Sequence, residues 1–339
     1  MRSPAFWWRA KPSPLASLLR PASMIYGAVA GARMRRPGER AGLPVICIGN
    51  FTAGGAGKTP TALAVADMLE AAGEIPAFLS RGYGGSLSGP LQVEEHHRAV
   101  EVGDEPLLLA SRALTIVSRN RPAGARLAYE IGATVVIMDD GLQNPSLVKD
   151  CAIAVVDGAT GIGNGLTLPA GPLRAPMQAQ WPAIDAVLLV GEGAGGEAVA
   201  REAERQGKRV FHAGLSPYPA AVEALRGRKV LAFAGIGRPD KFFETLRGCG
   251  AILERTRAFP DHHPYSAAEL AGLKEEAERM GLQAVTTEKD LSRIIGMGTP
   301  EPWTGLMTLP VRLDLENDTA FRNLVLRHIE ERRLRAASA

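Results

Sequence analysis

The sequence has few cysteines, little net charge and no long hydrophobic run, and each shortage removes a class of protein. Its 339 residues contain three cysteines, Cys47, Cys151 and Cys249, which are far apart and form no CxxC pair. This spacing argues against a disulfide framework and favours buried, reduced thiols in a cytosolic compartment. Apolar residues make up 46% and charged residues 22% of the chain, and no repeat is present at a solenoid period. Collagen-like and wholly disordered chains are thereby excluded.

A glycine-rich segment lies between an apolar run and a helical pattern. The apolar run covers residues 45–48, the glycine-rich segment residues 49–59 and the helical pattern residues 62–72. This order of strand, loop and helix is typical of a phosphate-binding loop, in which backbone N–H groups hold phosphate oxygens. Lys58 would offset the phosphate charge, and Thr59 would offer its hydroxyl to a magnesium ion.

The loop departs from the strict GxxxxGK[ST] pattern at one position. The pattern requires glycine where Thr52 stands, but Gly54, Gly55 and the flanking strand and helix compensate. ATP and Mg²⁺ are therefore the expected cofactors. The loop residues expected to bind the nucleotide are Thr52, Ala53, Gly54, Gly55, Ala56, Gly57, Lys58 and Thr59.

Acidic residues follow a second apolar run. The apolar residues 135–138 are followed by Asp139 and Asp140. Phosphoryl-transfer enzymes bind magnesium through a carboxylate at the carboxyl end of a strand beside the phosphate-binding loop. The expected metal ligands are Thr59, Asp139 and Asp140.

A base near the acceptor would also assist phosphoryl transfer, and Asp104 is a candidate. It precedes an apolar helical pattern, so it could equally be the N-terminal cap of that helix. His262 lies in a polar segment, residues 259–265, that is too sparse in spaced ligands for zinc. Taken alone, the composition of residues 259–265 predicts a surface loop.

Apolar runs alternate with helical patterns along the chain. The runs are rich in β-branched residues and lack polar alternation, which predicts a P-loop kinase-like α/β fold: a parallel sheet with helices on both faces. A second, smaller α/β unit is expected to begin near Arg228. Within it, Ser266 and Glu269 form a capping box that predicts a helix to about Met280, and a closing helix is expected from about Asp318. The expected domains are residues 1–40, 41–220 and 228–339.

Positive charge is concentrated in the first 40 residues, although the net charge of the chain is only +3. This N-terminal arm, residues 1–40, has one acidic residue, Glu39. Its uncharged stretch, residues 21–32, is shorter than the about 20 residues that a membrane-spanning helix needs. Its mixture of aromatic, aliphatic and basic residues predicts a basic amphipathic helix lying on an anionic membrane surface. A helix packed on the protein's own core is one alternative, and a secretory signal, disfavoured by the ATP-binding motif, is another. The basic residues of the arm are Arg2, Arg9, Lys11, Arg20, Arg33, Arg35, Arg36 and Arg40.

Seven short motifs occur in an order that resembles the tetraacyldisaccharide 4'-kinase family, the lipid A 4'-kinases of bacteria with an outer membrane. The resemblance covers nearly the whole chain. Several ordered matches are far more specific than any one of them. The motifs are GNFTAGGAGKTP (49–60), SRGYGG (80–85), GDEP (103–106), DDGLQ (139–143), LPAGPLR (168–174), GIGRP (235–239) and TEKD (287–290).

The resemblance implies an activity, a substrate and a location. The activity would be ATP- and magnesium-dependent phosphorylation of the 4'-hydroxyl of a tetraacylated glucosamine disaccharide 1-phosphate. The enzyme would be peripheral or monotopic at the cytoplasmic face of the inner membrane. By resemblance, Asp104 and His262 form a base dyad that acts with Lys58, and Thr52 matches the family's own loop. Ala175 departs from the pattern, because many members carry Glu there.

Two other classes of protein share some of these features. A membrane-associated P-loop ATPase switch carries a signature lysine five residues before the main one, where this sequence has Ala53. A nucleotide-binding module without transfer chemistry is the second alternative. Slow ATP turnover without an acceptor would favour either of them, whereas strict acceptor dependence would favour the kinase. No nucleic-acid partner is expected.

Overall fold

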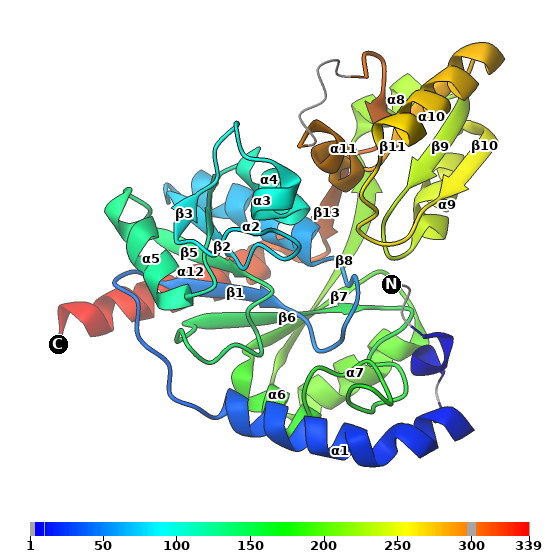
Figure 1. Ribbon diagram of the computed structural model, residues 1–339. Coiled ribbons are helices and arrows are strands. Elements are labelled where there is room, and N and C mark those ends of the chain that lie inside the picture. Colours follow the sequence, from blue (N-terminus) through cyan, green and yellow to red (C-terminus); the bar gives the residue numbers. More distant parts are fainter. Residues whose placement is uncertain (1–3, 10, 297–302, 339) are drawn as a thin grey trace.

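A nine-stranded sheet forms the larger part of the molecule (Figure 1). The computed structural model describes residues 4–9, 11–296 and 303–338. The strand order is β13-β8-β7-β6-β1-β5-β2-β4-β3, and neighbours are parallel except at the two edges, where β13 and β3 pair antiparallel. The strands are β1 (Val45–Gly49), β2 (Pro76–Ser80), β3 (Leu91–Gln92), β4 (Leu114–Val117), β5 (Val135–Asp139), β6 (Cys151–Asp157), β7 (Ala186–Val190), β8 (Arg209–Pro217) and β13 (Val311–Leu315).

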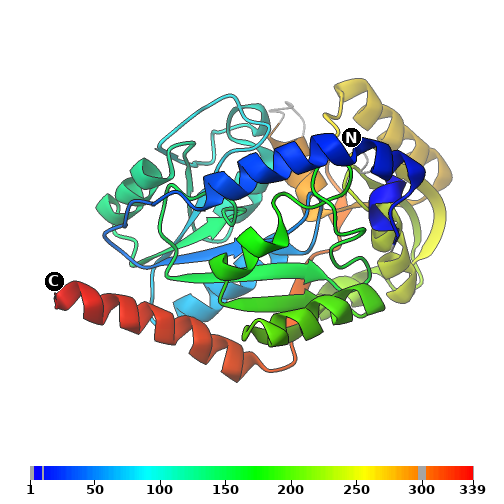
Figure 2. The same ribbon diagram turned by 90° about the horizontal axis from the view of Figure 1, so that it is seen from below.

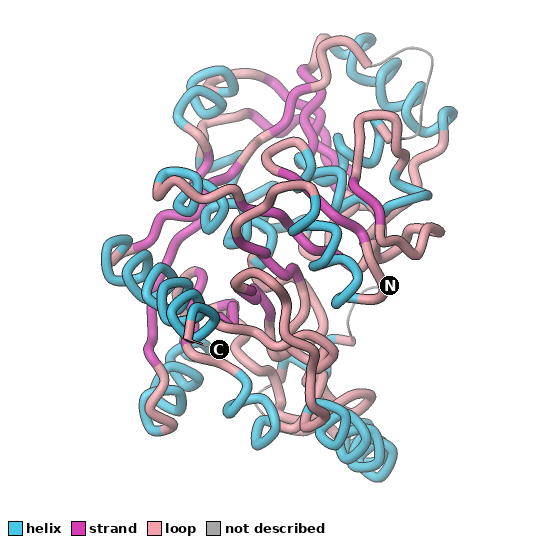
Figure 3. The backbone as a smooth tube through the Cα atoms, turned by 90° about the vertical axis from the view of Figure 1, so that its left-hand side faces the viewer, coloured by secondary structure: helices cyan, strands magenta, loops and turns pink. Residues whose placement is uncertain are grey.

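Helices cover both faces of this sheet, as the uninterrupted apolar strands predict. Along β1, Val45 and Cys47 face one helix layer, while Ile46 and Ile48 face the other, because successive side chains of a strand point to opposite faces. Figure 3 shows this layering from the side. One layer consists of α5 (Arg121–Glu130), α6 (Met177–Gln180), η2 (Trp181–Ala183) and α7 (Ala194–Arg205), and the other includes α2 (Lys58–Ala71), α4 (Asp104–Ala110) and α12 (Asp318–Ala337). The short α3 (Ala99–Val102) precedes α4.

A second, smaller sheet has the strand order β10-β9-β11-β12, with all pairs parallel. Apolar residues on both of its faces meet helices. The expected capping box is present, since Ser266 Oγ accepts the N–H of Glu269 and the Glu269 carboxylate accepts the N–H of Ser266. The elements are α8 (Pro219–Leu225), β9 (Lys229–Ala234), α9 (Pro239–Gly248), β10 (Ile252–Ala258), α10 (Ala267–Met280), β11 (Gln283–Thr286), α11 (Glu288–Ile295) and β12 (Met307–Thr308).

The C-terminal segment corrects the expected extent of the smaller domain. The sequence predicts that residues 228–339 form this domain, but β13 pairs with β8 at the edge of the large sheet. Helix α12 follows β13 and buries Phe321, Leu324 and Ile329 against that sheet. The chain thus leaves the large unit after β8 and returns to it at β13. The sequence pattern predicted the helix that begins near Asp318 but not β13. It also could not show which sheet these elements join, because strand pairing is a tertiary choice.

The N-terminal helix α1 (Pro14–Met34) lies along α6 on the outside of the large unit (Figure 2). Its inward face is built of small residues: Ala16, Ser23, Gly27 and Gly31 are buried. The Ser23 hydroxyl donates a 2.8 Å hydrogen bond to the carbonyl of Thr167. A Cβ added at Gly27 would lie 3.0 Å from the Thr167 hydroxyl, a tight contact that would require one of the two side chains to shift by a few tenths of an ångström.

The outward face of α1 carries its large apolar side chains. Leu18, Ile25 and Val29 are 77%, 69% and 65% exposed. The helix therefore packs on the protein through its small residues and presents aliphatic residues to the outside. Among the described residues, no helix is both long and apolar enough to cross a membrane. Arg2, one of the basic residues expected in this arm, lies outside the described residues.

Candidate active site

The glycine-rich loop connects the central strand β1 to α2, which begins at Lys58. Gly57 precedes the helix with φ +92°, a left-handed conformation that an L side chain rarely adopts. Two hydrogen bonds brace the loop: Asn50 Nδ2 donates to the carbonyl of Gly54 at 3.1 Å, and the N–H of Ala53 donates to the carbonyl of Pro172 at 2.8 Å. These bonds fix the loop at the start of a helix, where unpaired N–H groups favour an anion.

The acidic pair lies beside this loop because β1 and β5 are neighbours, with Ile48 paired to Asp139. Asp140 follows the strand with φ +51°, and its N–H donates to the carbonyl of Ile48 at 3.0 Å. Lys58 Nζ lies 3.7 Å from Asp140 Oδ1. Burial would raise the pKa of Asp140, but Lys58 and Arg174 hold that pKa below its ordinary value.

Asp139 is the more deeply buried of the two acids. Its Oδ1 has no hydrogen-bond partner among the residues that the structure describes. Burial and the neighbouring charges of Glu105 and Asp140 raise the pKa of Asp139 to about 7. A carboxylate oxygen left unpaired at a buried site costs free energy unless a cation or water meets it. Thr59 is also buried and carries a hydroxyl at the start of α2. The oxygens of Thr59, Asp139 and Asp140 are the kind of donor that Mg²⁺ prefers.

Two arginines support the loop and the acids, and sequence reasoning did not assign either a role. Arg174 Nη1 donates to both oxygens of Asp140 at 2.9 Å, and its Nε donates to the carbonyl of Thr52 at 3.1 Å. Arg121 is 2% exposed and donates to the carbonyl of Ser118 at 3.2 Å. Burial lowers the pKa of Arg121 to about 10. The LPAGPLR motif contains Arg174, but only the fold shows its partner.

Asp104 and His262 are brought side by side from the two units, although they are 158 positions apart. His262 Nδ1 lies 3.0 Å and 3.3 Å from the two carboxylate oxygens of Asp104. Asp104 is the first residue of α4, and Gly103, not Asp104, occupies the capping position. The side chain of Asp104 makes no cap hydrogen bond in that helix, so the alternative of a helix cap is not realised.

The Asp104 carboxylate is also paired with a third side chain. Arg293 Nη2 donates to Asp104 Oδ2, and Arg293 Nη1 donates to Asp290 at 2.7 Å. Burial would raise the pKa of Asp104, but His262 and Arg293 hold that pKa well below its ordinary value. The hydrogen bond with Asp104 raises the pKa of His262. A proton delivered to this pair is therefore held on the imidazole.

Further ion pairs join the two units around the loop. Lys289 Nζ lies 2.5 Å from Glu105 Oε1, and Lys289 lowers the pKa of that carboxyl. Arg238 pairs with Asp157, at the end of β6, and donates to the loop carbonyl of Gly55 at 3.3 Å. Charge from both units thus converges on the loop.

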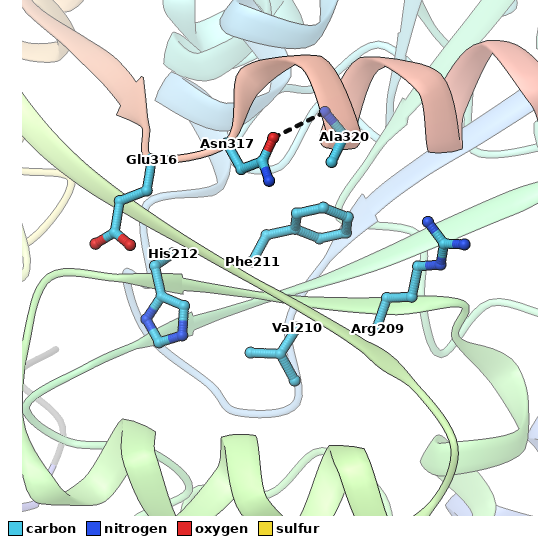
Figure 4. A pocket seen from close by; sticks show the side chains of 7 residues that line it. All are labelled: Arg209, Val210, Phe211, His212, Glu316, Asn317 and Ala320. Carbon is cyan, nitrogen blue, oxygen red and sulfur yellow. Dashed lines mark hydrogen bonds between the residues drawn. The ribbon is translucent and has the colours of Figure 1, made fainter.

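A cavity of about 320 Å³ lies elsewhere, between β8 and the start of α12 (Figure 4). Inside it, Asn317 Oδ1 accepts the N–H of Ala320 at 3.1 Å. None of the expected site residues lines it. Its lining residues are Arg209, Val210, Phe211, His212, Glu316, Asn317 and Ala320.

Comparison with known proteins agrees with this geometry. Residues 15–330 match the family model described as tetraacyldisaccharide-1-P 4'-kinase. The chain belongs to the tetraacyldisaccharide 4'-kinase family. It is 62% identical over 295 residues to a tetraacyldisaccharide 4'-kinase of Methylobacterium nodulans, covering 87% of this chain and 88% of the relative. It is 51% identical over 340 residues to one of a Bradyrhizobium species, covering 99% and 97% of the two chains.

A solved structure has the same fold as this kinase. It is a crystal structure of LpxK from Aquifex aeolicus in complex with ATP, 26% identical in sequence, with a TM-score of 0.72. The match covers 93% of this chain and 99% of that chain. The expected kinase-like α/β fold is therefore confirmed, and the membrane ATPase switch is not favoured.

The pairing of Asp104 with His262 predicts a pH-dependent contribution to stability. The pKa of His262 is raised in the folded protein above its ordinary value of 6.5, so folding stabilises the protonated imidazole. This contribution is complete below the ordinary pKa and is lost as the pH rises through the raised pKa. We expect His262→Gln to lower the thermal midpoint most at about pH 6 and least at about pH 9.

Thermal unfolding of both proteins across this pH range measures the difference. His212→Gln is the matched control, because His212 has no ion pair among the described residues. Its thermal midpoint is compared with that of wild type at each pH. A difference for His262→Gln that does not change with pH would contradict the pairing.

Proposed function

We propose that this kinase transfers the γ-phosphate of ATP to the 4'-hydroxyl of a tetraacylated glucosamine disaccharide 1-phosphate in lipid A biosynthesis. The observation that carries the proposal is the pairing of Asp104 with His262 beside a phosphate-binding loop. A hydroxyl acceptor must lose a proton during transfer, and a positioned carboxylate–imidazole pair can receive it. The family membership supports the identity of the acceptor.

The loop residues Thr52 to Thr59 would hold the nucleotide phosphates. Lys58 is positioned at the first turn of α2, where its ammonium would offset negative charge on the β- and γ-phosphates as their bond breaks. Its present contact with Asp140, at 3.7 Å, is loose enough to be exchanged for a phosphate oxygen. Thr59, Asp139 and Asp140 would hold Mg²⁺, which supplies charge neutralisation on the transferred group.

The proton of the 4'-hydroxyl would pass to the Asp104–His262 pair. Asp104 has a fixed orientation because Arg293 and His262 bind its two oxygens, which reduces the reorganisation needed during the reaction. Its depressed pKa makes Asp104 a weak final acceptor, whereas the raised pKa of His262 allows the imidazole to keep the proton. Asp104 therefore receives and relays the proton, and His262 shares it.

The helix α1 would hold the kinase on an anionic membrane surface. Its exposed aliphatic residues can bury in the headgroup region, while basic residues such as Arg20 and Arg33 meet anionic lipid, each at about 1 kcal/mol. A lipid acceptor resides in such a surface. The location that follows is peripheral, at the cytoplasmic face of the inner membrane, where ATP is available. No nucleic-acid partner is needed for this function.

The transfer itself is tested by incubating the purified kinase with ATP, Mg²⁺ and the lipid disaccharide 1-phosphate. We expect a product heavier by one phosphate in the mass spectrum, and ATP consumption that depends on the acceptor. Lys58→Ala should abolish the product, because the charge on the separating phosphates is then not offset. Near-normal turnover by Lys58→Ala, or ATP hydrolysis that ignores the acceptor, would overturn the proposal.

The proton relay predicts that Asp104→Asn reduces kcat by about 10²- to 10⁴-fold, equivalent to roughly 3–5 kcal/mol, while ATP affinity is largely unchanged. His262→Ala should cost less, since the carboxylate remains. The double variant should lose less than the product of the two single losses, because the residues act as one unit. Steady-state kinetics and nucleotide titration measure these effects. An active Asp104→Asn enzyme, or independent losses, would remove the pair from the mechanism.

Membrane binding through α1 is tested by flotation with anionic vesicles. Replacing Leu18, Ile25 and Val29 together by serine should reduce the bound fraction several-fold, because these side chains would otherwise bury in the interface. The matched control replaces Ile252, Ile295 and Leu334, which are also exposed but lie on other helices and strands. Equal flotation of the α1 variant and the control would contradict the assigned surface.

A further inference from the structure

Three side chains of the kinds that bind metals meet at the amino-terminal ends of two central strands, on the side of the sheet opposite to the phosphate-binding loop. Cys151 is the first residue of β6, and Asp185 immediately precedes β7, which runs parallel to β6. Both strands begin on the same side of the sheet, whereas the loop and Asp139 lie at the carboxyl ends of their strands. His328 reaches this edge from α12, so the cluster joins two strands and the C-terminal helix.

The ligand atoms are close enough to share one ion. The Cys151 sulfur, an Asp185 carboxylate oxygen and a His328 ring nitrogen all lie within 4.8 Å of one another. A zinc ion bound at about 2.0–2.3 Å from each ligand needs ligand atoms separated by roughly 3–4 Å. The upper limit of 4.8 Å in this cluster is close to that range.

The three side chains are largely free of competing partners. Asp185 Oδ2 accepts the N–H of Ala152 at 2.7 Å, which fixes the orientation of the carboxylate and leaves its other oxygen available. Among the described residues, no hydrogen bond or ion pair engages the side chain of Cys151 or of His328. Cys151 is fully buried, while Asp185 and His328 are partly exposed, so an ion has a route from solvent.

We propose that Cys151, Asp185 and His328 bind one Zn²⁺ ion, with water as its fourth ligand. Sulfur, imidazole nitrogen and carboxylate oxygen are the ligands that zinc takes in tetrahedral sites. The thiol loses its proton to solvent when the metal binds, so a thiolate, a carboxylate and a neutral imidazole balance the two charges of the ion. Mg²⁺ is a poor occupant, because it prefers an octahedral set of oxygens.

An ion at this place would fasten α12 to β6 and β7. Because the unfolded chain does not hold these three residues together, binding to the folded state alone raises the apparent stability with metal concentration. The role of the ion is structural and separate from phosphoryl transfer, which takes place at the carboxyl ends of the strands.

Cobalt titration of the full-length, metal-stripped protein tests the proposal, since Co²⁺ replaces zinc and a thiolate–cobalt bond absorbs in the near ultraviolet. Excess Mg²⁺ occupies the oxygen-rich site of Asp139 and Asp140. We expect one equivalent of Co²⁺ to produce the absorption, and Zn²⁺ to displace it. Cys151→Ser should abolish the band, whereas Cys249→Ser, at a buried thiol of the smaller unit, should leave it unchanged.

His328→Gln provides a second variant at a partly exposed position, where misfolding is less of a concern. It should weaken Co²⁺ binding at least tenfold and remove the rise in thermal midpoint that Zn²⁺ gives the wild-type protein. His212→Gln should retain both. Absence of the thiolate absorption in the wild-type protein, or its persistence in Cys151→Ser or at full strength in His328→Gln, would overturn the proposal.

Discussion

The pairing of buried charges at the carboxyl ends of the central strands is the constraint on which the rest of this structure depends. A carboxylate removed from water is tolerated only when a cation or hydrogen-bond donors meet it. Cations from the smaller unit supply part of this compensation, so seating that unit and completing the site are one event. Loss of Lys289 would leave Glu105 without its ion-pair partner, whereas Asp104 and Asp140 each have two cationic partners. The paired carboxylates are Asp104, Glu105 and Asp140, and the cations are Lys58, Arg174, Lys289 and Arg293. Asp139 lies beside them with one oxygen unpaired among the described residues.

The order of the large sheet explains why these groups converge. β1 lies in the middle of the sheet, with β5 on one side and β6 on the other. The loop after β1 is therefore flanked by Asp139 and by Asp157, each at the end of a neighbouring strand. Ligands of open α/β sheets bind beyond the carboxyl ends of the strands, where such residues gather. Arg238 and Lys241 of the smaller unit reach the same rim through Asp157.

Much of the local structure could be predicted from the sequence. Uninterrupted apolar runs predicted buried parallel strands such as β1 and β5, but not the less buried β8 and β10. The glycine-rich loop predicted a helix after it, although α2 begins at Lys58 and not near residue 62. Ser266 predicted the start of α10, because a capping box depends on short-range chemistry. Long-range pairing could not be read in this way. The bond between Arg174 and Asp140, the burial of Arg121 and the contact of Arg293 with Asp104 depend on how distant segments fold together.

For the N-terminal helix α1, too, the sequence predicts the element but not its contacts with the rest of the protein. Its sequence predicted an amphipathic surface helix, but periodicity alone does not distinguish the face that packs from the face that stays outside. The structure shows that Gly27 and Gly31 belong to the packing face, because a Cβ at either position would lie 3.3–3.6 Å from the ring of Pro176. The apolar face is left uncovered by the part of the chain that the structure describes, which hydrophobicity alone would not suggest.

The return of the chain to the large sheet at β13 has a mechanical consequence. The smaller unit is attached at both of its ends, through β8 on the way out and β13 on the way back, and these two strands are hydrogen-bonded neighbours. A body held by two adjacent attachments can turn about the line through them but cannot swing freely in other directions. Because His262 belongs to the smaller unit and Asp104 to the larger one, a turn about that line would change the separation of these two side chains.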